Sequence, residues 1–266
     1  CWMAAFVNGA LAHALDYDDT IDSNGIHPSA SIVPAALAAA EKVGGVSGKS
    51  FIAAVAAGMD MNVRLSCAVT GDVFQDFPWF PTTVFGGMSA AAAAGKVLSI
   101  DASQMTHAFG LMLDRTSGLS SSIMARGSDV RGIRDGYSNR DGLFAALMAK
   151  AGISACQNGL DALFEAFYAN ACDSSHLLAG IGSSFRIREV GLKPWPACRV
   201  AHSHIKAAMD LLARHCVSPD NIGEIRISVD RFGLEMLCTP IEEKRQPASP
   251  MDAKMSFPYI MGVVAA

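Results

Sequence analysis

The sequence is poor in charged residues and has no cysteine cluster of the kind that holds a metal ion. Only 17% of its 266 residues are Asp, Glu, Lys or Arg, and a net charge of -4 provides no basic surface for nucleic acid or an anionic membrane. The seven cysteines are scattered, without a C-x-x-C or a Cys/His group at zinc spacing. We therefore expect no structural metal and no disulfide framework, and a reducing cytoplasmic location.

Long uninterrupted apolar runs are also missing, although 51% of the residues are hydrophobic. The alanine-rich stretches are broken by Gly, Lys, Asp or Ser before they reach the roughly 20 residues that span a bilayer. No G-x-G-x-x-G follows a predicted strand, and neither a P-loop nor a G-x-S-x-G is present. We expect no membrane segment and no cofactor. The first residues, CWMAAFVNGA, lack the features of a signal peptide, and we expect them to lie inside a longer protein.

Helical patterns dominate the first two thirds of the chain. Apolar and small residues recur at helical spacing in segments that mostly begin at a capping residue or proline. These segments are residues 31–42, 48–65, 82–98, 102–113, 142–152 and 160–171, with Ser47 and Asp101 as predicted N-caps. The proline- and aromatic-rich residues 71–81 predict a loop, and so do the interleaved arginines and glycines of 126–140.

The pattern changes near residue 184. Residues 184–190 (SFRIREV) and 223–230 (GEIRISVD) alternate apolar and charged side chains, which is typical of half-exposed strands, and residues 201–216 between them predict a helix. This β-α-β order predicts a second domain. The expected fold is therefore mainly α, with a large all-helical domain over 1–183 and the start of a smaller α/β domain over 184–266.

Ionisable groups are concentrated in residues 8–34, NGALAHALDYDDTIDSNGIHPSASIVP. The group comprises His13, Asp16, Asp18, Asp19, Asp22 and His27. We expect them at a helix end and in the loop to the next helix, where they can point into a common cleft. Histidine exchanges protons near neutral pH, and Asp or Thr can orient it. The residues alone also allow a structural role, with Asp16 and Asp18 as caps and His27 bonded to backbone.

The arginines of residues 126–140 form a second candidate site. A forked guanidinium matches a planar carboxylate, so arginines in a glycine-rich loop are suited to bind a carboxylate substrate. The structural alternative is a solvated loop whose arginines pair with Asp129, Asp135 and Asp141. Tyr137, in the same segment, is a candidate acid or base, and its alternative role is simple packing.

Seven segments in order resemble the MmgE/PrpD family across nearly the whole chain. They are LDYDDT, HPSASIVPAALAAAE, SGKSFIAAVAAGMDMNVRL, PTTVFGGMSAAAAAGKVL, GSDVRGIRDGYSNRDGLFAALMAKAG, LKPWPACRVAH and MDAKMSFPYIMG. The family includes 2-methylcitrate dehydratases, cis-aconitate decarboxylases and an iminodisuccinate epimerase. The resemblance implies an all-helical domain and an α/β lid with the active site between them, further chain at both ends, and a homodimer.

The resemblance also implies roles for individual residues. Asp16, Thr20 and His27 match residues that line the substrate site, and Lys193 matches a lid lysine that can stabilise an enolate-like intermediate. Two positions depart from the family's lyases. Arg131 stands where they commonly carry Lys before a Leu-His-x-Gly stretch, and Phe80 stands where they often carry His. The pKa of arginine lies above roughly 12, and phenylalanine has no ionisable group. We therefore expect proton transfer to be lost at both positions, while binding of a carboxylate persists.

These observations predict a cofactor-independent lyase, similar to the 2-methylcitrate dehydratases, that removes a proton α to a carboxylate of a small di- or tricarboxylate. The predicted catalytic residues are His27, Asp16, Lys193 and Tyr137, and the predicted substrate-binding residues are Thr20, Arg131 and Arg134. An epimerase of a dicarboxylate such as iminodisuccinate and a non-catalytic carboxylate-binding homologue are the alternatives. No metal, nucleic acid or membrane partner is expected.

Overall fold

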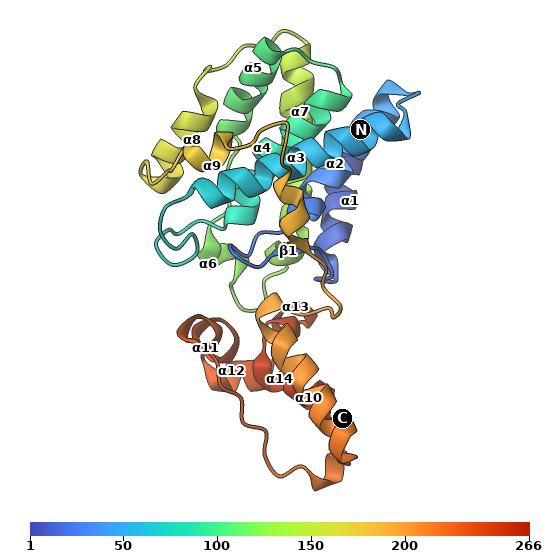
Figure 1. The fold of residues 1–266 in the computed structure, drawn as a ribbon, viewed down its shortest axis with the longest axis vertical. Coiled ribbons are helices and arrows are strands. Elements are labelled where there is room, and N and C mark those ends of the chain that lie inside the picture. Colours follow the sequence, from blue (N-terminus) through green and yellow to red (C-terminus); the bar gives the residue numbers. More distant parts are fainter. The chain divides into compact units, whose positions relative to one another are not determined.

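The computed structural model describes all 266 residues and is mainly α, which confirms the predicted fold class. The chain divides into two compact units (Figure 1). Unit 1 consists of Cys1–Ile123 and Val130–Leu192, and unit 2 of Met124–Asp129 and Lys193–Ala266. Residues 184–192, which the sequence pattern assigns to the second domain, belong to unit 1.

Unit 1 is a helical body with one pair of very short strands. Its α-helices are α1 (Trp2–Ala14), α2 (Pro28–Val43), α3 (Gly48–Ala68), α4 (Pro81–Val97), α5 (Ala102–Leu113), α6 (Ser120–Ile123), α7 (Val130–Lys150), α8 (Gly159–Tyr168) and α9 (Ser175–Leu178), followed by the 3₁₀ helix η1 (Arg186–Glu189). Strands β1 (Thr20–Ile21) and β2 (Val190–Gly191) pair antiparallel, with Thr20 opposite Gly191. This pairing ties the loop after α1 to the end of unit 1.

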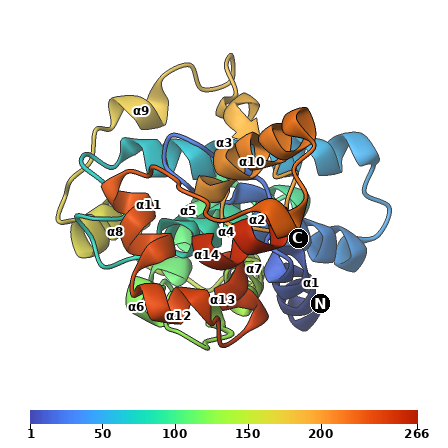
Figure 2. The same ribbon diagram turned by 90° about the horizontal axis from the view of Figure 1, so that it is seen from below.

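Helix α4 lies at the centre of unit 1 and is buried along most of its length. Helices α2, α3 and α7 pack against it, and α2 and α7 lie beside it in both views (Figure 2). Its small side chains allow this: a Cβ placed on Gly86 would lie 2.7 Å from Ser31 Oγ of α2. The alanine-rich sequence therefore serves close helix packing, and α2 and α7 both pack closely against α4.

The predicted helix starts at Ser47 and Asp101 are confirmed. The hydroxyl of Ser47 accepts a hydrogen bond from the backbone N–H of Ser50, at the start of α3. Asp101 and Gln104 form a reciprocal capping box at the start of α5. Helix α3 is long and apolar enough to pass a length-and-composition test for a membrane span, but more than half of that stretch is buried inside the protein, as in a core helix.

The predicted loop over 126–140 is wrong from residue 130 onward, because α7 begins at Val130. Its glycines do not break the helix; one of them lies where another helix approaches. A Cβ on Gly136 would lie 2.6 Å from the carbonyl oxygen of Phe6 in α1, and a Cβ on Gly9 would lie 2.8 Å from the carbonyl oxygen of Asp135. Glycine at these two positions lets the backbones of α1 and α7 come into direct contact.

Helix α2 begins at Pro28, three residues before the predicted start at 31, and continues through Pro34. A proline in a helix has no N–H for the carbonyl four residues earlier, here that of Ala30. The side chain of Asn139 in α7 replaces the missing bond: its amide nitrogen donates to Ala30 O at 2.7 Å, and its Oδ1 accepts from the N–H of Ala35 at 2.8 Å. Asn139 thus fastens α2 to α7.

The two predicted long strands are wrong. Residues 186–189 form η1, only Val190–Gly191 is a strand, and residues 223–230 form neither helix nor strand. A period-two pattern describes which face of a strand is apolar, but a strand also needs a neighbour for its backbone hydrogen bonds. The short β2 finds that neighbour in β1, and residues 223–230 have no partner strand in this structure.

Unit 2 is helical. It contains the 3₁₀ helices η2 (Arg199–Ala201) and η3 (Pro219–Asn221) and the α-helices α10 (His202–His215), α11 (Arg231–Cys238), α12 (Ile241–Arg245), α13 (Pro250–Lys254) and α14 (Phe257–Ala265). Helix α10 confirms the helix predicted at 201–216. A small core that includes Ile205, Leu237 and Phe257 lies between α10, α11 and α14. This unit contains no strand, contrary to the expected α/β composition.

Candidate active site

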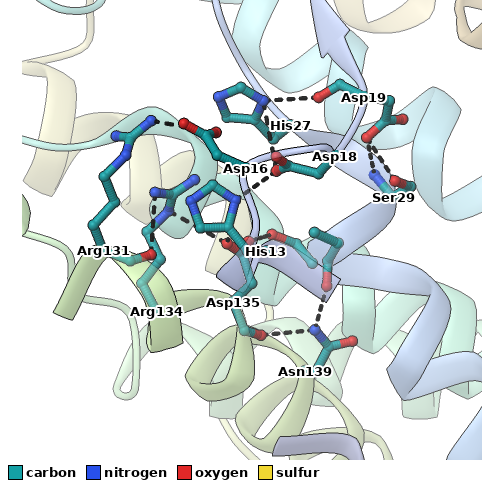
Figure 3. Close-up of polar contacts among 12 residues, drawn as sticks. His13, Asp16, Asp18, Asp19, His27, Ser29, Arg131, Arg134, Asp135 and Asn139 are labelled. Atoms are coloured by element: carbon teal, nitrogen blue, oxygen red, sulfur yellow. Dashed lines mark hydrogen bonds and ion pairs between the residues drawn. The ribbon is translucent and has the colours of Figure 1, made fainter. Parts of the chain in front are cut away.

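A buried polar cluster forms where the end of α1, the loop after it, the start of α2 and the first turns of α7 meet (Figure 3). Its members are His13, Asp16, Asp18, His27, Arg131, Arg134 and Asp135, and each is less than 9% exposed. Arg131, Arg134 and Asp135 share one face of α7, because side chains three and four residues apart on a helix point the same way. The structure therefore brings the two stretches that the sequence singles out into one site.

His27 precedes the first residue of α2, and its ring orientation is fixed by the preceding loop. Its Nδ1 lies 2.7 Å from the carbonyl oxygen of Asp19. A carbonyl oxygen can only accept, so Nδ1 carries the proton and the lone pair of the neutral ring is on Nε2. The side chain of Asp19 in turn accepts from the N–H and the hydroxyl of Ser29, at 3.0 Å and 2.6 Å. Asp19 is a helix cap that also holds His27.

Asp18 lies between two histidines. Its Oδ2 is 2.7 Å from Nδ1 of His13 and 3.6 Å from Nδ1 of His27. Burial, followed by the nearby positive charge of Arg134, lowers the pKa of His13, while Asp18 and Asp135 act in the opposite direction. A neutral His13 with a proton on Nδ1 donates to Asp18, and its buried Nε2 has no hydrogen-bond partner. Sequence reasoning gave His13 no role, although it belongs to the same charged stretch.

The two arginines supply the positive charge of the cluster. Nη2 of Arg131 lies 3.9 Å from Oδ1 of Asp16, and Nε of Arg134 lies 3.4 Å from Oδ2 of Asp135. Both guanidinium groups lie over the ring of Phe80, at 5.6 Å and 4.5 Å from its centroid. Burial lowers the pKa of Arg134 from its ordinary value, but arginine stays protonated in proteins. The two guanidinium groups therefore form a buried cationic pair over the Phe80 ring.

Asp135 connects the cluster to the helix packing beneath it. Its Oδ1 accepts a short hydrogen bond from the hydroxyl of Ser31 in α2. Its backbone carbonyl accepts from the side chain of Asn139 at 2.7 Å. Asp16 has a left-handed backbone with φ of 57°, and its N–H donates to the carbonyl of His13 at 2.7 Å, so the loop turns sharply as it leaves α1. The positions of Asp16 and Asp135 are thus fixed by hydrogen bonds with residues of α1, α2 and α7.

Not all the predicted residues belong to the cluster. Thr20 is buried in β1, directly after the clustered Asp residues. Tyr137 lies on the other side of α7, 40% exposed, with its ring against Phe6 and the guanidinium of Arg140. Lys193 is the first residue of the second stretch of unit 2, and its place relative to the cluster stays a prediction.

The alternative that the arginines pair with neighbouring acidic residues holds in part. Arg140 pairs with Asp141 at 2.7 Å, outside the cluster. Arg126, at the start of the predicted loop, lies in unit 2, where it faces Glu243 at 3.6 Å. Arg131 and Arg134 are therefore the two arginines of this segment that the fold brings to His27.

Three potential ligand atoms in the cluster, from His13, Asp16 and Asp18, lie within 4.8 Å of one another. Their closeness does not by itself define a metal site. Nδ1 of His13 already donates to Asp18, and Asp16 faces the guanidinium of Arg131. Since Asp16 is paired with an arginine and Asp18 with His13, we assign no metal ligands here.

The fold and the cluster together define a helical protein with a histidine and an arginine pair at one buried site. The chain belongs to the MmgE/PrpD family: the model of the MmgE/PrpD N-terminal domain matches residues 2–176, and that of the C-terminal domain matches residues 195–266. The family assignment made from sequence segments is therefore confirmed.

Curated relatives are similar at modest identity. The chain is 26% identical to cis-aconitate decarboxylase of Aspergillus terreus, over 98% of this chain and 56% of that protein. It is 27% identical to the cis-aconitate decarboxylases of Mus musculus and Homo sapiens, in each case over 97% of this chain and 53% of the relative. The chain thus spans about half the length of the curated relatives that it matches.

Proposed function

We propose that this chain carries the proton-transfer and carboxylate-binding groups of a cofactor-independent lyase that acts on small di- or tricarboxylates. One observation carries the proposal: His27, with Nδ1 held by a backbone carbonyl, shares a buried cluster with the guanidinium groups of Arg131 and Arg134. This combination supplies a base beside a carboxylate-binding surface. The names of the relatives, cis-aconitate decarboxylases, support a small polycarboxylate as substrate.

In the proposed reaction, Nε2 of His27 accepts the proton from the carbon α to a substrate carboxylate. The electron pair of the broken C–H bond first enters an enolate-like intermediate. It then forms a C=C bond as the bond to the β-hydroxyl breaks; the proton that His27 took up passes to this hydroxyl, which leaves as water, and His27 returns to its neutral form. Arg131 and Arg134 hold the carboxylate and stabilise the added negative charge, which is where a preorganised cation lowers the barrier most.

The remaining residues receive supporting roles in this proposal. Asp16 and Thr20 orient the substrate, and Lys193 stabilises the enolate-like intermediate. Tyr137 is less suited to act on the substrate, because its ring packs against Phe6 and Arg140 on the far side of α7. Dehydration is the reaction we favour, and decarboxylation is a second outcome open to the same set of groups.

A second candidate is an epimerase that removes the same proton and returns one to the opposite face. The observation that favours it is the composition of the cluster around His27. Phe80, Arg131 and Arg134 occupy positions near it, and none of these side chains exchanges a proton near neutral pH. An epimerase has no leaving hydroxyl to protonate, so it does not need a proton donor for a leaving group at these positions.

The candidates are separated by incubating the intact protein in deuterated water with a panel of di- and tricarboxylates. Proton NMR then follows deuterium incorporation, alkene formation and loss of carbon dioxide. A lyase gives an alkene, whereas an epimerase gives deuterium incorporation with inversion and no alkene. Binding of a carboxylate with neither exchange nor alkene indicates a non-catalytic homologue and contradicts the proposal.

A further inference from the structure

The carboxylate of Asp18 faces two imidazole rings that have the same proton-bearing atom directed toward it. Nδ1 of His13 lies 2.7 Å from Oδ2, and Nδ1 of His27 lies 3.6 Å from the same oxygen. The ring centroids are 5.8 Å apart (Figure 3). The shorter distance is a full hydrogen bond and the longer one is not, so the two rings share Asp18 unequally.

We propose that His13 is a positioning residue, which holds Asp18 partly away from His27 and thereby sets how tightly His27 binds its proton. This inference rests on the proposed role of His27 as the base. A carboxylate bonded to a protonated imidazole stabilises the charged ring, as an opposite charge within a few ångströms does. Because the Asp18 carboxylate is hydrogen-bonded to His13, it stabilises the protonated ring of His27 less strongly. His27 therefore stays neutral, and able to accept a proton, at lower pH.

His13 is suited to this role because burial favours its neutral form. It is 0% exposed, and burial together with Arg134 lowers its pKa, which favours the neutral ring that donates to Asp18. Neutral imidazole keeps one ring proton, and the carboxylate of Asp18, which can only accept, holds that proton on Nδ1. His13 therefore acts as a permanent donor to Asp18.

Other charged groups also lie around His13, His27 and Asp18, and they contribute to the pKa of His27 together with Asp18. They are Asp16 and Asp19 from the loop after α1, and Arg131, Arg134 and Asp135 from α7. Arg134 is paired with Asp135, and Arg131 with Asp16, so these four charges largely balance each other. Asp19 presents its backbone carbonyl to His27 while its carboxylate caps α2. Of these groups, Asp135 also lies near His13, with Oδ2 3.8 Å from Nδ1, whereas the hydrogen bond of His13 is to Asp18.

The test is a histidine NMR titration of the intact protein without substrate, with the His27 signal assigned by its loss in His27→Gln. In His13→Phe, which removes the donor, the titration midpoint of His27 is expected to rise by about one pH unit. His13→Asn is the matched control, because the amide nitrogen of Asn can occupy the position of Nδ1. The titration midpoint of His27 in this variant should stay near that of the wild type. Asp18→Asn should shift the midpoint in the opposite direction, downward.

An unchanged His27 midpoint in Asp18→Asn overturns the proposal, whether or not His13→Phe folds. Equal midpoints in folded His13→Phe and in the wild type overturn it as well. With substrate, the acid limb of kcat/KM should move by the same amount, so that His13→Phe is about tenfold slower at a pH below both midpoints. A shifted NMR midpoint combined with full turnover in His27→Gln would instead refute the proposed function and leave the His13 inference intact.

Discussion

The guanidinium carbon of Arg134 lies 4.5 Å from the centroid of the Phe80 ring, and Arg134 is only 1% exposed. A cation placed over an aromatic face without water is stabilised by about 2 kcal/mol. Phe80 occupies a position where the resemblance places a histidine in the family's lyases. In this chain the position contributes no proton-transfer group, and its ring instead packs against the guanidinium groups of the two arginines.

Replacing Phe80 with Leu should weaken carboxylate binding more than turnover. The aliphatic side chain keeps most of the apolar volume but loses the negative ring face, so Arg131 and Arg134 are held less firmly. We expect KM to rise about tenfold with kcat changed less than threefold, in steady-state kinetics on the intact protein. Phe164→Leu, in the core cluster away from the arginines, is the control and should lower thermal stability without raising KM.

Replacing His27 with Gln should reduce turnover and spare binding. Glutamine keeps a hydrogen-bonding group of similar reach but cannot accept the substrate proton. Positioned acid or base groups contribute about 10²- to 10⁴-fold, and kcat should fall by a factor in that range. Isothermal titration with the substrate should give a nearly unchanged Kd. Near wild-type turnover in this variant would show that His27 is only a structural histidine bonded to Asp19.

Replacing Arg131 with Ala should show the converse pattern. Loss of a bidentate carboxylate partner costs about 1.5 to 3 kcal/mol, so binding should weaken by roughly 10- to 150-fold while kcat at saturation falls much less. Arg131→Lys keeps the positive charge but loses the planar pair of N–H donors of the guanidinium group, and we expect an intermediate KM. If Arg131→Ala leaves KM unchanged, the carboxylate is held elsewhere.

The bond between Asn139 and the helix carbonyl that Pro34 leaves unpaired is open to a double-mutant test. Asn139→Ala leaves the buried carbonyl of Ala30 and the buried N–H of Ala35 without the hydrogen bonds to Asn139. It should destabilise the protein by about 2 to 4 kcal/mol. Pro34→Ala restores an N–H for Ala30, so Asn139→Ala should cost less in that background. Thermal unfolding of the four proteins measures the coupling, and purely additive shifts would show that Asn139 does not substitute for the helix bond.

The lowered pKa of His13 predicts how stability depends on pH. The folded protein keeps His13 neutral, whereas the unfolded chain takes up a proton as the pH falls through about 6.5. The unfolded state then binds more protons, so the free energy of unfolding decreases as the pH is lowered below that value. Melting temperatures measured from pH 7.5 to 5 should fall less steeply in His13→Asn. Parallel curves for the two proteins would contradict this assignment.

The sequence was informative wherever local chemistry determines local structure. The caps at Ser47 and Asp101 and the proline-rich loop before α4 follow from backbone hydrogen bonding within a few residues, and each was predictable. The concentration of charge in residues 8–34 likewise coincides with part of the buried polar cluster, because buried charges are costly and are kept together with partners.

What could not be predicted depends on contacts between distant segments. The arginine segment looked like a loop because Gly132 and Gly136 normally interrupt helices, and the approach of α1 that explains Gly136 is not visible in the local sequence. The approach of His13 to Asp135, 122 residues later, and the pairing of residues 190–191 with β1 also depend on the tertiary fold. Pro34 alone indicates a helix start, but α2 continues through it because the side chain of Asn139 in α7 supplies the missing hydrogen bond.

The contact between Gly9 and α7 affects how mutational scans of this protein should be interpreted. A side chain on Gly9 would be pushed against the carbonyl of Asp135 and within 2.5 Å of the amide of Asn139, which hold the cluster in place. Substitutions there should abolish activity as completely as loss of the base, although Gly9 contacts no ligand. A scan scored by activity alone would rank Gly9 with the reacting groups, and only a parallel measurement of protein abundance would separate the two kinds of intolerance.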